Sequence, residues 1–534
     1  MPPPTAKEVL LAPSRDPSAS NPSKPPSASW LAFDVEKFAP LIVSLMIAYA
    51  AVRNLCAAAV RPLWLDEIST FIIVRQHRVS TMWDALKRGA DGLPLPFYLL
   101  QWPVANALGN EQVSFRLLSI IGFSITVACL FLLIRKRNSS TAALVCAAIP
   151  LVTALFDTYA VEARPYTLVL ACLSFALVCY QRAPEFRWMV LMGLSLAFAQ
   201  ALHYYAVLGF MPFVLAEAAR TLQVRRVRWS VWFALACGLV PLIGLWTFLS
   251  GLKTTYGAHL WAKPTLLGAA SSYGWFFNTT FTLGIEFAAV SIMAVILAMF
   301  PAPDRGSRVQ VEASFHEHVL VLGFLGLPLF CFIVAKLGHG GMTERYTLPT
   351  VLGFPLALGY SLPRTGRRTA AVLAGVALCL VVVFVRQESR FWSSYTGRFV
   401  SPAASVENFV GSTGYENLPV VISPAGDFLQ LAHYASPNWR TRFVAIVDAQ
   451  KGVAYLGSDS IDIQLDVLRR YAPLQIYDFG AFAADHPVFL LYSAGTIWDW
   501  WPRGLSEDGY TLRVLAVKDV YRRVFLVSRN KSAE

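Results

Sequence analysis

Two adjacent carboxylates, Asp66 and Glu67, follow the first long apolar run of the chain, at about residues 38–60. A carboxylate at the edge of a membrane can take a proton from an attacking hydroxyl group, and a neighbouring carboxylate can orient it. The same pair can also simply cap the helix that follows, because acidic residues stabilise the first turn of a helix. The choice between these interpretations depends on what else the chain places beside the pair.

Further polar and aromatic residues cluster at the ends of later apolar runs. Each type has a structural explanation as well as a functional one. An arginine at such an end can reach lipid head groups, Glu162 and Arg164 can form an ion pair that holds a turn, and aromatic side chains form interfacial belts. The candidates for binding or supporting roles are Asp91, Tyr98, Arg116, Glu162, Arg164, Tyr166, His203, Tyr204, Arg345 and Tyr346.

The composition indicates what kind of protein carries these clusters. Of the 534 residues, 56% are hydrophobic and 15% are charged, whereas soluble domains carry about 25% charged residues. Many apolar runs approach the roughly 20 residues that a membrane-spanning helix needs. We therefore expect an α-helical polytopic membrane protein with about eleven spans, at approximately 38–60, 113–134, 141–158, 165–181, 188–203, 205–219, 229–250, 281–300, 317–336, 345–362 and 369–386.

The positive charge is concentrated in short loops on one side of these spans. Such loops face the cytoplasm, so the net charge of +12 suits membrane orientation rather than nucleic-acid binding. With a cytoplasmic N-terminus and an odd number of spans, the carboxylate pair, the other clusters and the C-terminal part all face the outside. The cationic loops are 135–137, 182–187, 220–228, 304–308 and 364–368.

Composition divides the chain into three parts. Residues 1–37 are rich in Pro and Ser and are expected to form a disordered cytoplasmic tail. Residues 38–386 form the membrane domain, with residues 61–112 as its first outer loop. In residues 387–534, strand-like runs alternate with helix-like ones, which predicts an extracytoplasmic α/β domain. This domain either helps to hold an acceptor or is structural.

Two other features of the sequence bear on the site. The loop 251–280 carries Tyr256, His259, Trp261, Lys263 and Trp275, a composition that suits a segment partly inserted into lipid. The eight cysteines all lie in or beside apolar runs and show no CxxC spacing, so we expect neither a disulfide framework nor a cysteine metal site.

Several short motifs occur in a set order and on one side of the membrane. They are the Asp66-Glu67 pair, DGLPLPFYLL at 91–100, RLLS at 116–119, EARPY at 162–166, HYY at 203–205 and ERYTLP at 344–349. Together they resemble the GT-C glycosyltransferases of the protein O-mannosyltransferase superfamily. The similarity is greatest to bacterial branches that glycosylate lipid A, such as aminoarabinose transferases, or other envelope glycans, and it covers roughly residues 38–386.

The resemblance implies a polyprenyl-phosphate-sugar donor, an active site at the outer face of the bacterial cytoplasmic (inner) membrane, and inversion at the anomeric carbon. The acidic pair of the family maps onto Asp66 and Glu67, and its phosphate-binding arginine maps onto Arg345, with Arg164 as a second candidate. Many relatives have His-Pro-Pro before a Tyr pair, whereas residues 93–96 here are Leu-Pro-Leu-Pro. Any role of that histidine is therefore not carried over.

These residues suggest a mechanism in which Asp66 takes the proton of an acceptor hydroxyl and Glu67 orients Asp66, the acceptor or a cation. Arg345, alone or with Arg164, then stabilises the leaving phosphate. No metal is required by this scheme, although a divalent cation held by Asp66 and Glu162 is an alternative. Two other functions stay open at this point: a transporter or flippase of lipid-linked glycans, and a non-catalytic envelope assembly protein.

Overall fold

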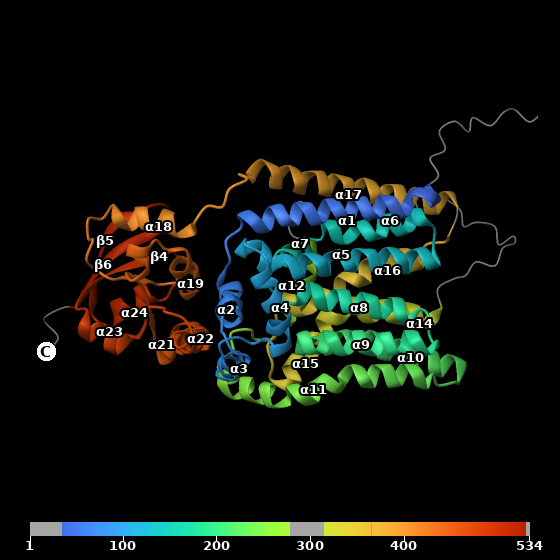
Figure 1. The fold of residues 1–534 in the computed structure, drawn as a ribbon, viewed down its shortest axis with the longest axis horizontal. Helices are drawn as coiled ribbons and strands as arrows, with labels where there is room; N and C mark the ends of the chain where they lie inside the picture. The colour runs from blue at the N-terminus through green and yellow to red at the C-terminus, as the bar shows by residue number, and fades with distance from the viewer. Residues whose placement is uncertain (1–34, 278–313, 365, 530–534) are drawn as a thin grey trace, which may run out of the picture.

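The computed structural model describes residues 35–277, 314–364 and 366–529. These residues form a bundle of helices and a C-terminal α/β domain, which lies beyond one end of the bundle (Figure 1). The last bundle helix, α17 (Arg367–Ser394), leads through residues 395–401 into that domain.

The helices of the bundle run roughly parallel to one another (Figure 1). Their apolar composition places them in a bilayer, where a helix satisfies its own backbone hydrogen bonds. Besides α17, the bundle contains α1 (Val35–Val60), α5 (Glu111–Arg137), α6 (Ser140–Ala148), η1 (Ile149–Val152), α7 (Ala154–Ala160), α8 (Tyr166–Tyr180), α9 (Phe186–Leu202), η2 (Tyr204–Phe210), α10 (Met211–Val224), α11 (Trp229–Tyr256), α12 (Leu266–Phe277), α14 (Phe315–Leu325), α15 (Leu327–Gly338), η3 (Glu344–Leu352) and α16 (Gly353–Ser361).

The membrane-spanning character of the bundle agrees with the prediction, but the number of eleven spans is not confirmed. Among the described residues, five helices are long and apolar enough to cross a membrane. The number rises to seven if two bent pairs, α6 to α7 at 71° and α14 to α15 at 61°, each count as one span. Helices α8 and α9 are apolar but shorter. The span predicted at 281–300 lies outside the described residues.

Helices α5 and α8 approach each other closely at Gly122. A Cβ atom there would lie 2.6 Å from the carbonyl carbon of Thr167, so only glycine fits. The same contact aligns Ser119, whose hydroxyl donates a 2.9 Å hydrogen bond to the carbonyl of Arg164 and also bonds the carbonyl of Glu162. Close helix packing therefore fixes the turn that carries two of the candidate site residues.

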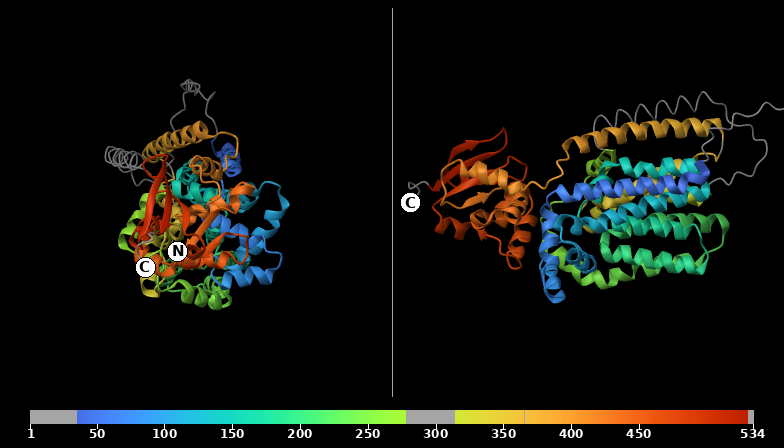
Figure 2. Two further views of the ribbon diagram at one scale, coloured as in Figure 1. Left: turned by 90° about the vertical axis from the view of Figure 1, so that its left-hand side faces the viewer. Right: turned by 45° about the horizontal axis from the view of Figure 1, so that its top comes forward.

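The predicted first outer loop folds into three short helices at the end of the bundle that faces the C-terminal domain (Figures 1 and 2). They are α2 (Leu65–Val74), α3 (Val79–Lys87) and α4 (Leu95–Ala107). The described turns rich in Arg and Lys, such as those between α8 and α9 and between α10 and α11, lie at the opposite end of the bundle (Figure 1).

The C-terminal domain confirms the predicted α/β fold. Its sheet has the order β3-β2-β1-β4-β6-β5, in which β1 to β4 are parallel and β6 is antiparallel to both β4 and β5. The strands are β1 (Val420–Ile422), β2 (Phe443–Val447), β3 (Ile476–Asp478), β4 (Val488–Ser493), β5 (Tyr510–Val517) and β6 (Arg523–Arg529). The helices are α18 (Pro402–Gly411), α19 (Ala425–Tyr434), α20 (Pro437–Arg440), α21 (Ala449–Leu456), α22 (Ser460–Leu468), α23 (Phe479–Asp485) and α24 (Trp501–Glu507).

Hydrogen bonds join this domain to the outer-loop helices. The Leu63 amide donates to the hydroxyl oxygen of Tyr434 at 2.8 Å, and the Leu63 carbonyl accepts from Gln430 at 2.9 Å. The amide of Gln464 donates to Ser69 Oγ and to the Ala90 carbonyl, both at 3.1 Å. The C-terminal domain is thus seated directly on the segment that contains Asp66.

Candidate active site

Asp66 lies in the first turn of α2, where two arginines meet one carboxylate oxygen. Its Oδ2 accepts a hydrogen bond from Arg345 Nη1 at 2.5 Å and lies 3.3 Å from Arg164 Nη2. Burial alone raises the pKa of the Asp66 carboxyl, but the charges of Arg164 and Arg345 outweigh that effect and hold the pKa below its ordinary value. Asp66 is therefore ionised, and 15% of its side chain is exposed.

Arg164 has a second carboxylate partner in Asp91. Arg164 Nη1 donates to Asp91 Oδ2 at 2.5 Å, and the Tyr98 hydroxyl donates to the same oxygen at 2.7 Å. The other oxygen of Asp91 accepts from the Gly92 amide at 2.7 Å. Only 3% of the Arg164 side chain is exposed, so this guanidinium is enclosed and its charge is balanced by two carboxylates.

Arg345, in η3, is more open and lies among aromatic rings. Its side chain is 13% exposed, and Nε donates to Thr343 Oγ1 at 3.2 Å. The centre of its guanidinium lies 5.6 Å from the Trp261 ring, 5.9 Å from Tyr346 and 6.0 Å from Tyr166. Cation–π attraction of this kind favours the charged side chain where water is scarce.

The rings around Arg345 belong to a larger aromatic cluster. Tyr205 stacks on Tyr346 with ring centres 4.1 Å apart, and His203 lies 5.5 Å from Tyr346 and 5.4 Å from Tyr166. Tyr204 stacks on His203 at 5.0 Å. The structure thus gathers the predicted residues Tyr166, His203, Tyr204 and Tyr346 beside the predicted phosphate ligand.

Glu67 points away from this group and is fully buried. Its carboxylate accepts hydrogen bonds from Arg116 Nε at 2.7 Å and Nη2 at 2.5 Å, from the Ala163 amide at 2.8 Å and from the Trp64 amide at 3.2 Å. The last bond caps the first turn of α2. Arg116 in turn donates to the carbonyls of Ala58, Arg61 and Pro62. Glu67 therefore positions the backbone around Asp66, and its acceptor capacity is used within the protein.

Glu162 lies in the turn between α7 and α8 and is nearly buried. Its Oε1 is 3.8 Å from Arg61 Nη2, and its Oε2 is buried without a hydrogen-bond partner. Burial raises the pKa of Glu162 to about 8, and the negative charges of Glu67 and Asp66 act in the same direction. The ion pair with Arg164 that the sequence suggested is not formed, because the described salt bridges of Arg164 go to Asp66 and Asp91.

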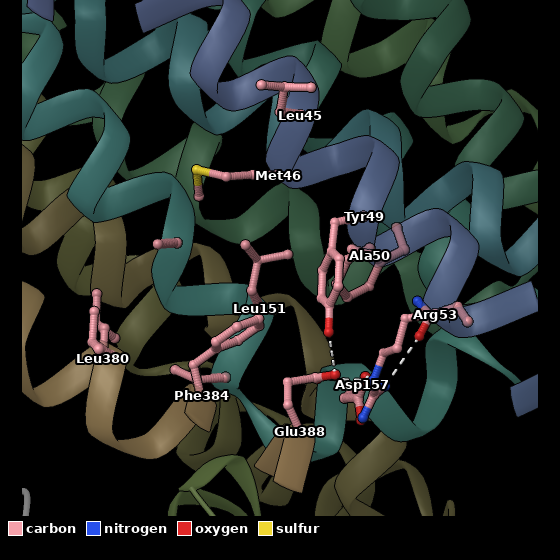
Figure 3. A pocket seen from close by; sticks show the side chains of 15 residues that line it. Leu45, Met46, Tyr49, Ala50, Arg53, Leu151, Asp157, Leu380, Phe384 and Glu388 are labelled. Carbon is pink, nitrogen blue, oxygen red and sulfur yellow. Dashed lines mark hydrogen bonds and ion pairs between the residues drawn. The ribbon is translucent and has the colours of Figure 1, made fainter. Parts of the chain in front are cut away.

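A second group of charges lies close by, at the polar end of a pocket between α1, η1, α7 and α17 (Figure 3). The pocket has a volume of about 460 Å³ and mostly apolar walls. At its polar end, Arg53 pairs with Asp157 at 2.5 Å and with Glu388 at 3.0 Å. These pairs hold α17, and so the tether of the C-terminal domain, against the helix that precedes Glu162.

Sequence reasoning missed several residues of the site. Arg61, which lies beside Glu162, and Tyr159, whose ring lies 5.0 Å from that of Tyr166, carry no signal beyond their position at an expected membrane boundary. Tyr205 was part of the HYY motif but was not named as a candidate by itself. Trp261 was expected to contact lipid, but it lies beside Arg345 instead. The described residues bring together no three His, Cys, Asp or Glu side chains suited to hold a metal ion.

Comparisons with known proteins bear on the fold of the chain. Residues 92–250 match the dolichyl-phosphate-mannose-protein mannosyltransferase family. The fold resembles that of ArnT from Cupriavidus metallidurans in the apo state, with a TM-score of 0.54, 11% identity, and coverage of 91% of this chain and 98% of ArnT. ArnT bound to undecaprenyl phosphate aligns with a TM-score of 0.50, 13% identity and the same coverage.

An oligosaccharyltransferase from Archaeoglobus fulgidus aligns more weakly, with a TM-score of 0.42, 12% identity, and coverage of 93% of this chain and 75% of that chain. No curated protein matches the sequence. The family match over residues 92–250 and the ArnT-like fold support the resemblance to GT-C glycosyltransferases that the motifs suggested. The chain is a multi-pass membrane protein whose fold is similar to that of ArnT.

The buried Glu67–Arg116 pair predicts a large effect on stability. In Arg116→Leu, Glu67 remains buried without its cationic partner, and breaking a buried pair in this way costs about 3–5 kcal/mol. We expect a strongly lowered Tm for Arg116→Leu in detergent, and a smaller loss when Glu67→Leu is added. Arg187→Leu serves as the control, because Arg187 is an exposed arginine of which 77% of the side chain is accessible. Equal Tm values for the two single variants would contradict the structural role.

The raised pKa of Glu162 predicts how stability depends on pH. The unfolded chain releases this proton near pH 4.5, whereas the folded chain keeps it until about pH 8. Folding stability therefore declines between these values, by an amount on the order of a few kcal/mol. Thermal unfolding from pH 5 to 8.5 should show a smaller loss of Tm for Glu162→Gln than for the parent, whereas exposed Glu185→Gln should follow the parent. Parallel curves for Glu162→Gln and the parent would show that Glu162 titrates normally.

Proposed function

We propose that this protein transfers a sugar from a polyprenyl-phosphate donor to a hydroxyl group of an envelope glycan, lipid or protein, with inversion. The reaction takes place at the outer face of the bacterial cytoplasmic membrane, with the N-terminus in the cytoplasm and the C-terminal domain outside. The direct contact between the Asp66 carboxylate and the partly exposed Arg345 guanidinium carries the proposal. The family match and the fold shared with ArnT, which has been observed with undecaprenyl phosphate, support it.

Arg345 is the better candidate for the donor phosphate. A guanidinium has five N–H donors and binds phosphate through two of them. Arg345 has one carboxylate partner among the described residues, whereas Arg164 is enclosed by Asp66 and Asp91. The aromatic rings beside Arg345 keep water away from the phosphate. In a water-poor site Arg345 stabilises the phosphate charge more strongly.

Phosphate binding at Arg345 also prepares Asp66 for its role as a base. Arg164 and Arg345 together hold the pKa of Asp66 below its ordinary value, which makes it a weak proton acceptor. A donor phosphate competes for Arg345, so Asp66 keeps Arg164 as its main cationic partner and its pKa rises. The free oxygen of Asp66 is then available to the acceptor hydroxyl.

The chemical step is a single displacement. The acceptor oxygen forms a bond to the anomeric carbon while its proton passes to Asp66. The bond between that carbon and the phosphate oxygen breaks on the opposite face, which inverts the configuration. The electron pair leaves with the polyprenyl phosphate, whose growing negative charge Arg345 stabilises. Asp91 and Tyr98 hold Arg164, and Glu67 with Arg116 holds the backbone of α2. None of these roles uses a metal ion.

The placement of charges favours this function over a transporter. A transporter of lipid-linked glycans is expected to carry ionisable residues near the middle of its spans. Helix α8 has no charged residue, and the charges of α5 and α11 lie near the helix ends. Charge is therefore concentrated where a reaction at the membrane surface needs it.

Replacing Asp66 with Asn separates catalysis from binding. Without the base, turnover should fall by about 10²–10⁴-fold. The affinity for undecaprenyl phosphate should be unchanged or higher, because Asp66 no longer competes for Arg345. Turnover is read from the envelope glycans of a deletion host complemented with each variant, by mass spectrometry with the membrane level of the protein matched. Turnover near the parent rate would exclude Asp66 as the base.

Arg345→Ala should have the complementary effect. The variant loses a charge-assisted hydrogen bond to the phosphate, so its affinity for undecaprenyl phosphate should fall by at least about tenfold. Binding is measured by thermophoresis on the purified full chain, with Arg187→Ala at the far end of the bundle as the control. Unchanged affinity would show that the phosphate binds elsewhere.

A further inference from the structure

Residues 257–264, here called the strap segment, follow α11 and lie between the membrane domain and the C-terminal domain. One side of the segment contacts residues that lead to Arg345, and the other side contacts two turns of the C-terminal domain. The same short segment therefore links the candidate phosphate ligand to a domain that otherwise has no assigned role.

The inner side of the strap segment packs against the approach to η3. The Ala262 carbonyl accepts a 2.9 Å hydrogen bond from the Met342 amide. At Gly341, an added Cβ would lie 3.0 Å from Leu260 Cδ2 and 3.2 Å from Ala262 Cβ, so the two segments are in tight contact. Trp261 completes this side, with its ring 5.6 Å from the centre of the Arg345 guanidinium.

The outer side is held by the C-terminal domain. His259 Nδ1 lies 3.4 Å from Asp459 Oδ2, at the start of α22. The ring of Trp498 meets that of Trp261 edge-on, with centres 6.3 Å apart. The turn before α22 also lies near Lys263. A Cβ atom added at Gly457 in this turn would be 3.4 Å from Lys263 Nζ. The His259–Asp459 and Trp261–Trp498 contacts thus hold the strap segment against the C-terminal domain.

We propose that the C-terminal domain positions Arg345 through the strap segment, with Trp261 and His259 as positioning residues. The Trp261 ring is near both Trp498 and Arg345, so the C-terminal domain restricts the position of the indole ring. The indole ring in turn restricts the guanidinium by cation–π attraction and by excluding water. The inference rests on the proposed role of Arg345 as the ligand of the donor phosphate.

A positioning role makes a specific kinetic prediction. Loosening the strap segment misplaces Arg345, so the donor binds more weakly and its KM rises. The acceptor KM does not change, because Asp66 keeps its contact with Arg164. A purely structural role for the strap segment would lower the amount of folded protein and leave both KM values as they are.

The test uses two variants on the C-terminal domain, Trp498→Ala and Asp459→Ala, in the full chain. Each should weaken the binding of undecaprenyl phosphate by about three- to tenfold, whereas Trp261→Phe, which retains an aromatic ring, should stay close to the parent. Matched controls are Ile497→Ala, whose residue is 85% exposed beside Trp498, and Asp485→Asn on the surface of the same domain. In an Arg345→Ala background, Trp498→Ala should cause no further loss.

The outcomes separate this inference from the proposed function. If Arg345→Ala weakens binding but Trp498→Ala and Asp459→Ala bind like Ile497→Ala, the strap inference is wrong and the proposed function stands. If Arg345→Ala itself binds like the parent, the proposed function is wrong. If Trp498→Ala weakens binding equally with and without Arg345, its effect does not pass through the arginine, and the inference is overturned.

Discussion

The site depends on one constraint, which is that every buried charge at the end of the bundle facing the C-terminal domain needs a partner of opposite sign. At Asp66 the pairing of charges can change when a ligand binds, because Arg164 and Arg345 meet at a single oxygen of its side chain. Arg164 is committed to Asp91 as well, and Arg116 is committed to Glu67. A buried ion without a partner of opposite charge is destabilising. An anionic ligand that binds Arg345 therefore changes the pKa of Asp66 directly.

The same constraint explains why two adjacent carboxylates have different roles. Successive residues of a helix point about 100° apart, so Asp66 and Glu67 leave the first turn of α2 in different directions. Glu67 enters the bundle and pairs with Arg116, while Asp66 turns toward η3. The sequence raised helix capping and catalysis as competing explanations of the pair, yet Glu67 caps the helix and Asp66 occupies the candidate site.

Much of the fold could be predicted from the sequence, because long apolar runs and short strand-like apolar runs are local signals. Ten of the eleven predicted spans coincide with helical segments among the described residues. Strand β3 was missed, since Ile476–Asp478 is short and mostly exposed. The predicted orientation of the spans also placed the candidate residues together at one end of the bundle. Their pairing was beyond local signals, since Asp66 and Arg345 are 279 residues apart.

The C-terminal domain also contributes to the arrangement of the site. Sequence patterns predicted its α/β fold but not its contacts. The loop 251–280, which contains residues 257–264, was predicted to be partly inserted into lipid because it carries aromatic and cationic residues. In the structure these side chains connect the domain to Arg345. A reaction centre at a membrane surface must keep out bulk water, and a domain seated on the outer-loop helices helps to provide that enclosure.

The binding of the donor phosphate by Arg345 is tested most directly by a structure of the full chain with undecaprenyl phosphate, determined by electron cryo-microscopy. We expect the phosphate in contact with Arg345, and Asp66 displaced from Arg345 while it remains beside Arg164. A phosphate bound elsewhere, with the 2.5 Å contact between Asp66 and Arg345 intact, would contradict it.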